Sequence, residues 1–89
     1  MKTISILVKG KVQGVFFRKY AKDKADELDV SGFVKNINDG SVYIEATGNE
    51  DALNKLVAWC NHGPMLAQVA SVETNLMELH DFDGFEISY

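Results

Sequence analysis

The stretch ISILVKGKVQGVFFRKYAKDKADEL, residues 4–28, contains a strand pattern, a glycine loop and a helix pattern, in that order. From Ile4 to Val8 every second residue is β-branched, which predicts a β-strand that ends near Lys9. Glycines stand at both ends of the next segment, Gly10–Gly14, and indicate a loop. From Phe17 to Leu28 apolar residues recur at helical spacing with charged residues between them, which predicts an amphipathic helix.

A β-hairpin is predicted after this helix. Val30–Ile37 is rich in β-branched and aromatic residues, and Ser41–Thr47 alternates between apolar and polar residues, so both segments are predicted strands. Asn38, Asp39 and Gly40 lie between them. The Asp-Gly pair supplies the positive φ angles that a tight hairpin turn requires.

A second helix and a further strand follow the hairpin. Asn49 is a predicted N-cap, and Gly63-Pro64 is typical of a helix stop. Gln68–Leu76 predicts a strand, although Val69 and Val72 fall on opposite phases of the alternation. A β-bulge is one explanation for this change of phase.

The short alternating segment Phe85–Tyr89 predicts a last strand at the end of the chain. The order of elements is then β-α-β-β-α-β, with the final β in two pieces. This order predicts an α+β, ferredoxin-like sandwich with two helices on one face of a mainly antiparallel sheet. Because the chain has 89 residues, we expect a single domain over residues 1–89.

Composition narrows the classes of function. The fractions of hydrophobic (46%) and charged (25%) residues are ordinary for a globular protein, and the net charge of −4 argues against a general nucleic-acid binder. The longest purely apolar run, Leu56–Cys60, is far shorter than the ~20 residues that span a bilayer. The apolar run after Lys2 is broken at Lys9, so no signal peptide is visible. With a single cysteine and no export signal, we expect a cytoplasmic protein. We also expect a monomer.

Charge is distributed unevenly along the chain. Residues 1–35 carry eight basic and four acidic side chains, a net charge of +4, so the remainder carries −8. This asymmetry predicts a local positive field that favours capture of a small anion. A solvated helix face is the alternative explanation for the same lysines.

The chain has one arginine, Arg18, among nine basic residues. A guanidinium offers a rigid planar fork for paired hydrogen bonds to a phosphate or carboxylate. Arg18 lies where the segment Gly10–Phe17 meets the first helix, so its side chain, the loop N–H groups and the positive helix end can converge on one anion. An ordinary surface arginine remains the alternative. Asn36 stands at a strand position where asparagine is disfavoured, and from there its amide can face the same anion.

Other candidate groups favour structural interpretations. His62 and His80 have no nearby cluster of metal-ligand type, and Cys60 falls on the apolar stripe of the second helix. Asp81 and Asp83 flank a phenylalanine in a predicted loop, so we interpret them as solvated residues. We therefore expect no metal site and no cofactor.

Two segments together resemble the acylphosphatase family. The run VKGKVQGVFFR, residues 8–18, resembles the first family signature, and GFVKN, residues 32–36, followed by DGSV, residues 39–42, resembles the second. The resemblance covers essentially the whole chain. Phe33 and Ile37 depart from it, because tryptophan and threonine are frequent at these positions, but neither change touches the two polar positions.

The resemblance implies an acid-anhydride hydrolase that cleaves the carboxyl-phosphate bond of acyl phosphates without a metal, giving a carboxylate and inorganic phosphate. It implies that Arg18 holds the phosphoryl group and that Asn36 orients the attacking water. It also assigns phosphoryl binding to the backbone amides of Gln13, Gly14, Val15, Phe16 and Phe17.

Two other functions share parts of this pattern. A non-catalytic ferredoxin-like module that binds a phosphorylated small ligand is possible, because a similar domain begins larger hydrogenase-maturation proteins and a fold does not fix a function. An RNA-recognition domain has the same order of elements, but the net charge of −4 disfavours it. The expected partner is a small-molecule acyl phosphate, with no nucleic acid and no membrane.

Overall fold

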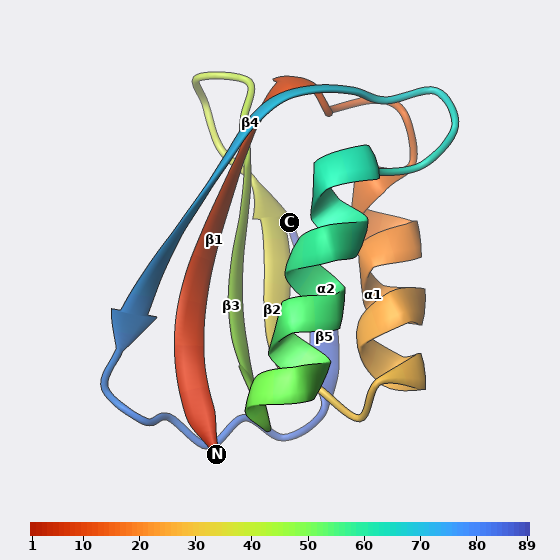
Figure 1. Ribbon diagram of the computed structural model, residues 1–89. Coiled ribbons are helices and arrows are strands. Elements are labelled where there is room, and N and C mark those ends of the chain that lie inside the picture. The colour runs from red at the N-terminus through yellow and green to blue at the C-terminus, as the bar shows by residue number, and fades with distance from the viewer.

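The computed structural model describes residues 1–89 and contains five strands and two helices (Figure 1). In chain order they are β1 (Lys2–Lys11), α1 (Phe17–Glu27), β2 (Ser31–Asn36), β3 (Val42–Gly48), α2 (Glu50–His62), β4 (Gln68–Met77) and β5 (Phe85–Ser88). The strands form one sheet in the order β4-β1-β3-β2-β5, and both helices pack on the same face of it. The predicted ferredoxin-like α+β fold is therefore confirmed. Neither helix has the length and apolar character needed to cross a membrane.

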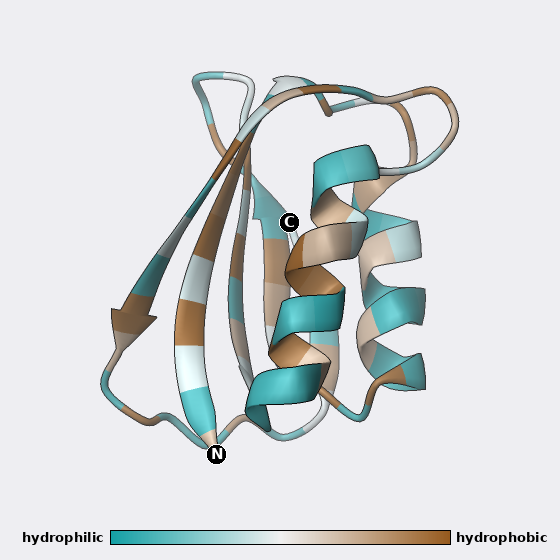
Figure 2. Cartoon of the chain, viewed as in Figure 1, coloured by the Kyte–Doolittle hydropathy of each residue, from teal (hydrophilic) through white to brown (hydrophobic).

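The core lies between the sheet and the two helices. Apolar and polar residues alternate along β1 and β3, as the hydropathy colours of Figure 2 show, and the buried residues of both helices recur at helical spacing. Ile6 and Ile44 are opposite each other on neighbouring strands, and both are fully buried. The helices contribute Phe17, Ala21, Ala25, Ala52, Leu53, Leu56 and Cys60.

The two pieces of the final predicted β region lie at opposite edges of the sheet. β4 pairs antiparallel with β1, whereas β5 pairs parallel with β2. The connecting loop is tied to the sheet, because the His80 N–H donates to Thr3 Oγ1 at 2.9 Å and Thr47 Oγ1 donates to the His80 carbonyl at 2.7 Å. These bonds hold the β4–β5 loop against the sheet where it crosses from one edge to the other.

The irregular alternation in β4 comes from a β-bulge. Lys9 is opposite Ser71 and Gly10 is opposite Val69, so Ala70 has no partner. The extra residue changes the phase and lets Val69 and Val72 both pack against the core. The bulge offered as an explanation of the sequence is confirmed.

Gly10 belongs to β1, so its assignment to the loop was wrong. The strand continues past the bulge to Lys11 beside β4. A Cβ atom at Gly10 would lie 2.2 Å from the Gln68 carbonyl oxygen, and φ is +127° there. The glycine is needed because the two backbones approach this closely at the bulge.

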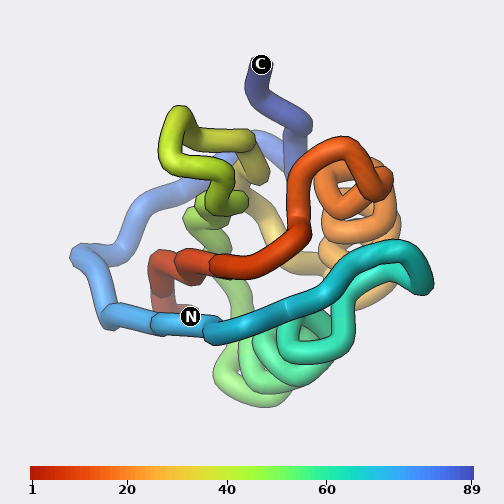
Figure 3. The backbone as a smooth tube through the Cα atoms, turned by 90° about the horizontal axis from the view of Figure 1, so that it is seen from above, coloured from red at the N-terminus to blue at the C-terminus, as the bar shows by residue number.

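The C-terminal ends of β1, β2 and β5 lie at the same end of the sheet. β1 and β2 are both antiparallel to β3, and β5 is parallel to β2, so all three run in the same direction. The loop between β1 and α1, the β2–β3 hairpin and the segment after β5 therefore gather together, as the view from above shows (Figure 3). This topology brings residues from distant parts of the chain to one site.

Gly32→Ala is expected to lower the free energy of unfolding by about 3 kcal/mol or more, because the new Cβ requires separation of β2 from β3. A Cβ at Gly32 would lie 1.9 Å from the Glu45 carbonyl oxygen, and φ is +144°. Gly84→Ala is the matched control: the φ of Gly84 is also positive, at +83°, but a Cβ added there would have no neighbouring atom within 4 Å. The control should cost about 1 kcal/mol from backbone strain alone. Urea unfolding followed by circular dichroism measures both values, and equal losses would contradict the close-approach argument.

Candidate active site

The loop between β1 and α1 is fixed by its own side chains. Val12, Val15 and Phe17 are buried in the core, whereas Gly14 and Phe16 are exposed. Gly14 and Phe16 both have positive φ, at 73° and 66°. A left-handed phenylalanine costs about 1 kcal/mol and is typical of backbone held in a required shape. The loop thus curls in a defined conformation with its backbone turned outward.

The backbone N–H groups of this loop are unpaired. None of the amides of residues 13–19 donates to a backbone or side-chain acceptor, and the start of α1 has no side-chain cap and no acidic residue in its first turn. The start of α2 has both features: the Asn49 side chain accepts from the Ala52 amide at 2.8 Å, and Glu50 and Asp51 follow. Unpaired amides at a helix N-terminus bind anions well. The start of α1 is therefore suited to bind an anion.

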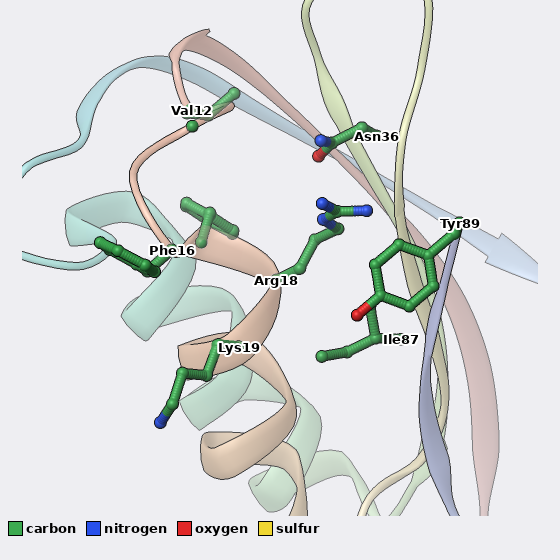
Figure 4. A pocket seen from close by; sticks show the side chains of 9 residues that line it. Val12, Phe16, Arg18, Lys19, Asn36, Ile87 and Tyr89 are labelled. Atoms are coloured by element: carbon green, nitrogen blue, oxygen red, sulfur yellow. The ribbon is translucent and has the colours of Figure 1, made fainter.

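A pocket of about 320 Å³ opens at this point. Arg18, on the first turn of α1, and Asn36, the last residue of β2, point toward one another across it (Figure 4). Both side chains are partly buried. The complete lining is Val12, Gly14, Phe16, Phe17, Arg18, Lys19, Asn36, Ile87 and Tyr89. No carboxylate, histidine or cysteine side chain is among these residues.

Tyr89 covers one face of the Arg18 guanidinium. The centre of the guanidinium lies 4.8 Å from the centroid of the Tyr89 ring. Lys35 on β2 is opposite Ser88 on β5, so the next pair of positions brings Tyr89 beside Asn36. This cation–π contact leaves the N–H edges of the guanidinium free while it limits the orientation of the plane. Arg18 makes no ion pair with any carboxylate, so its charge is available to a ligand.

The positive field at the pocket comes from fewer groups than the sequence indicates. Five of the nine basic side chains form ion pairs, including Lys22 with Asp26 and Lys24 with Glu27 on α1. The paired lysines of α1 lie on a solvated face of that helix, which is the alternative explanation given above for them. The four basic residues without an ion pair all lie toward the pocket end of the fold: Lys9, Lys11, Arg18 and Lys35.

The hairpin holds Asn36 at the rim of the pocket. Its turn is closed by the Ile37 N–H, which donates to the Ser41 carbonyl at 3.0 Å. The Ser41 N–H donates to Asp39 Oδ1 at 2.9 Å, and this bond lowers the pKa of the Asp39 carboxyl. The Asn36 carboxamide itself makes no hydrogen bond within the protein, so both its donor and acceptor groups face the pocket.

The structure places the predicted site residues in two groups. Gly14, Phe16, Phe17, Arg18 and Asn36 line the pocket together. Gln13 and Val15 do not line it: the Val15 side chain is in the core, and the Gln13 side chain donates to the β2–β3 hairpin. Their backbone amides are unpaired like those of their neighbours.

Sequence reasoning missed four of the lining residues, namely Val12, Lys19, Ile87 and Tyr89. Val12 lies within the predicted loop and Lys19 directly follows Arg18, so both could have been included by their position alone. Ile87 and Tyr89 carry no comparable signal, because only the pairing of β5 with β2 brings them to Asn36.

The groups set aside on sequence grounds lie outside the pocket. Cys60 is fully buried, and burial raises the pKa of its thiol to about 12, so it is not a nucleophile at neutral pH. The His80 ring packs on Phe82 with 4.3 Å between centroids. Asp81 and Asp83 are exposed.

The fold and the pocket define a ferredoxin-like α+β protein with a pocket at one end of its sheet, lined by Arg18, Asn36 and residues of the uncapped start of α1. The sequence pattern of the Acylphosphatase family matches residues 4–87. The acylphosphatase of Archaeoglobus fulgidus is 43% identical over 89 residues, which cover both chains completely. That of Shewanella amazonensis is 49% identical over 75 residues, 84% of this chain and 82% of the relative. The crystal structure of acylphosphatase from Bacillus subtilis superposes with a TM-score of 0.96 at 36% identity, covering 100% of each chain. The chain belongs to the acylphosphatase family and is a hydrolase of that class.

Proposed function

We propose that this protein hydrolyses acyl phosphates at the pocket between Arg18 and Asn36, without a metal ion. Water forms a bond to phosphorus, the bond between phosphorus and the carboxyl oxygen breaks, and the carboxylate leaves with the electron pair of that bond. The products are a carboxylate and inorganic phosphate. The observation that carries the proposal is the uncapped start of α1, where residues with unpaired amides and the only arginine line one pocket.

Arg18 and the loop amides bind the phosphoryl group in this proposal. Phosphoryl transfer depends mainly on positioning and on neutralising the charge of the equatorial oxygens. A guanidinium fork and a set of backbone N–H groups supply both, since they are fixed before the substrate arrives. The buried side chains of Val12, Val15 and Phe17 support this role, because they prevent the loop from rearranging.

Asn36 orients the attacking water in this proposal. Its free carboxamide can accept a hydrogen bond from the water or donate one to it. The pocket lining contains no carboxylate or histidine side chain that could act as a general base. A phosphate oxygen of the substrate therefore takes the proton of the water.

The leaving group needs no protonation. Its conjugate acid has a pKa of about 4, so the carboxylate departs as an anion without a general acid. The same feature explains how the reaction can proceed without a divalent cation: the main demand on the site is to offset phosphoryl charge, which Arg18 and the amides do.

Hydrolysis of benzoyl phosphate, followed in the ultraviolet with EDTA present, tests the function. We expect turnover at a rate that EDTA does not change. Asp39→Asn should retain kcat within about threefold, because Asp39, the one carboxylate of the hairpin turn, is not the base. A folded protein that binds inorganic phosphate without turnover would instead support the non-catalytic module, and a collapse of kcat in Asp39→Asn would contradict the substrate as base.

We also propose a cytoplasmic monomer. The single cysteine supports this location, because small exported domains are typically held by disulfides and one cysteine forms none within the chain. Sedimentation equilibrium at micromolar concentration tests the oligomeric state.

A further inference from the structure

The side chain of Gln13 bridges the loop and the hairpin. Its Nε2 donates to the Ile37 carbonyl at 2.8 Å and to the Ser41 carbonyl at 2.9 Å. These two carbonyls belong to the residues that flank the hairpin turn, and the Ile37 N–H already donates to the Ser41 carbonyl. Both hydrogens of the Gln13 carboxamide therefore donate to carbonyls of the same hairpin turn. Gln13 is partly buried, which strengthens such bonds relative to fully exposed ones.

These bonds join the two halves of the proposed site. Gln13 directly precedes Gly14 in the loop, and Ile37 directly follows Asn36. No strand pairing connects the two segments, because β1 pairs with β3 only as far as Val8 opposite Val42. No other hydrogen bond links residues 12–17 to residues 36–41. The Gln13 side chain is therefore the one hydrogen-bonded link between the loop and the hairpin turn beside Asn36.

We propose that Gln13 is a positioning residue that acts through Asn36. Its carboxamide fixes the hairpin against the loop, so that a water held by Asn36 lies in line with a phosphoryl group held by the loop. The proposal rests on the proposed function of the site. It concerns the side chain alone, because the backbone amide of Gln13 is present in every variant.

The chemistry of the residue fits this role. A carboxamide offers two N–H donors from one nitrogen, which matches two carbonyls on the same turn. A glutamate would place carboxylate oxygens against these carbonyl oxygens, and a leucine of similar size would offer no donor. Either change removes the bridge while the chemical groups of Arg18, Asn36 and the loop backbone stay unaltered.

Gln13→Leu is expected to lower kcat for benzoyl phosphate by about ten- to a hundredfold, as small misplacements of reacting groups do. KM and the inhibition constant of inorganic phosphate should stay within about twofold, because the phosphate-binding groups are untouched. Gln68→Leu, on the exposed start of β4, is the matched control and should retain kcat. All assays are run well below the melting temperature of each variant, so that loss of folded protein does not enter.

A double variant separates positioning from simple stabilisation. If Gln13 acts through Asn36, Gln13→Leu combined with Asn36→Ala should be no slower than Asn36→Ala alone. Losses that multiply would overturn the inference, as would an unchanged kcat in Gln13→Leu. These results are distinct from failure of the proposed function, in which the wild-type protein itself would not hydrolyse benzoyl phosphate.

Discussion

Arg18→Ala is expected to lower kcat/KM for benzoyl phosphate by about a thousandfold or more, because an arginine that stabilises a transferring phosphoryl group contributes on that scale. Affinity for inorganic phosphate, measured by calorimetry, should fall with it. The variant should fold, since the guanidinium makes no ion pair and its one described contact is with the Tyr89 ring. Arg18→Lys keeps the charge without the fork and should remain about a hundredfold below the wild type.

A charge control distinguishes the fork from the general positive field. Lys55→Ala removes one positive charge on α2, where Lys55 pairs with Asp51 away from the pocket, and should leave kcat/KM unchanged. Full activity in Arg18→Lys would mean that a point charge is sufficient and that bidentate contact is not used. Full activity in a folded Arg18→Ala would place the phosphoryl group elsewhere.

The fold could be predicted from local patterns because each element carries its own signal. Alternation in β1 and β3, helical spacing in α1 and α2, and the Asp39-Gly40 turn each act over fewer than fifteen residues. The Asn49 cap was predicted from residue type and is present in the structure. The change of phase in β4 suggested a bulge, but the sequence does not show that Gly10 on β1 lies opposite it.

The site could be predicted only in part. Arg18 and the loop stood out because one arginine beside two glycines is a local signal. The contact of Tyr89 with Arg18 depends on β5 crossing to β2, a separation of about seventy positions along the chain, so no local pattern carries it. The left-handed conformation of Phe16 was equally hidden, because phenylalanine disfavours it.

The charge at the pocket could also be predicted only in part from the sequence. Counting residues placed a net charge of +4 in the first 35 positions, but several of these lysines are neutralised by carboxylates one turn along α1. What remains at the pocket is set by topology, because the ends of β1 and β2 bring Lys9, Lys11 and Lys35 to the same end as Arg18. The count predicted a positive field, and the structure identifies the unpaired groups behind it.

Asn36→Ala is expected to lower kcat by about a hundred- to a thousandfold, the usual scale for loss of one polar group that acts in the transition state. The inhibition constant of inorganic phosphate should change little, because Arg18 and the loop amides still bind the phosphoryl oxygens. The variant should fold, since the Asn36 side chain makes no hydrogen bond within the protein. Stopped-flow or steady-state hydrolysis of benzoyl phosphate gives kcat, and phosphate inhibition gives the binding constant.

Asn36→Asp separates hydrogen bonding from charge at the same position. The carboxylate can still accept a hydrogen bond from water, but it faces an anionic substrate across the pocket, so both kcat and phosphate affinity should fall. Asn54→Ala, an exposed asparagine on α2, is the matched control and should keep both constants. Loss of phosphate affinity in Asn36→Ala equal to its loss of kcat would assign Asn36 to phosphoryl binding instead of water. The split between the two constants therefore decides which partner of the reaction Asn36 holds, because phosphate inhibition reports on the groups that bind the phosphoryl oxygens, whereas kcat also depends on the placement of the attacking water.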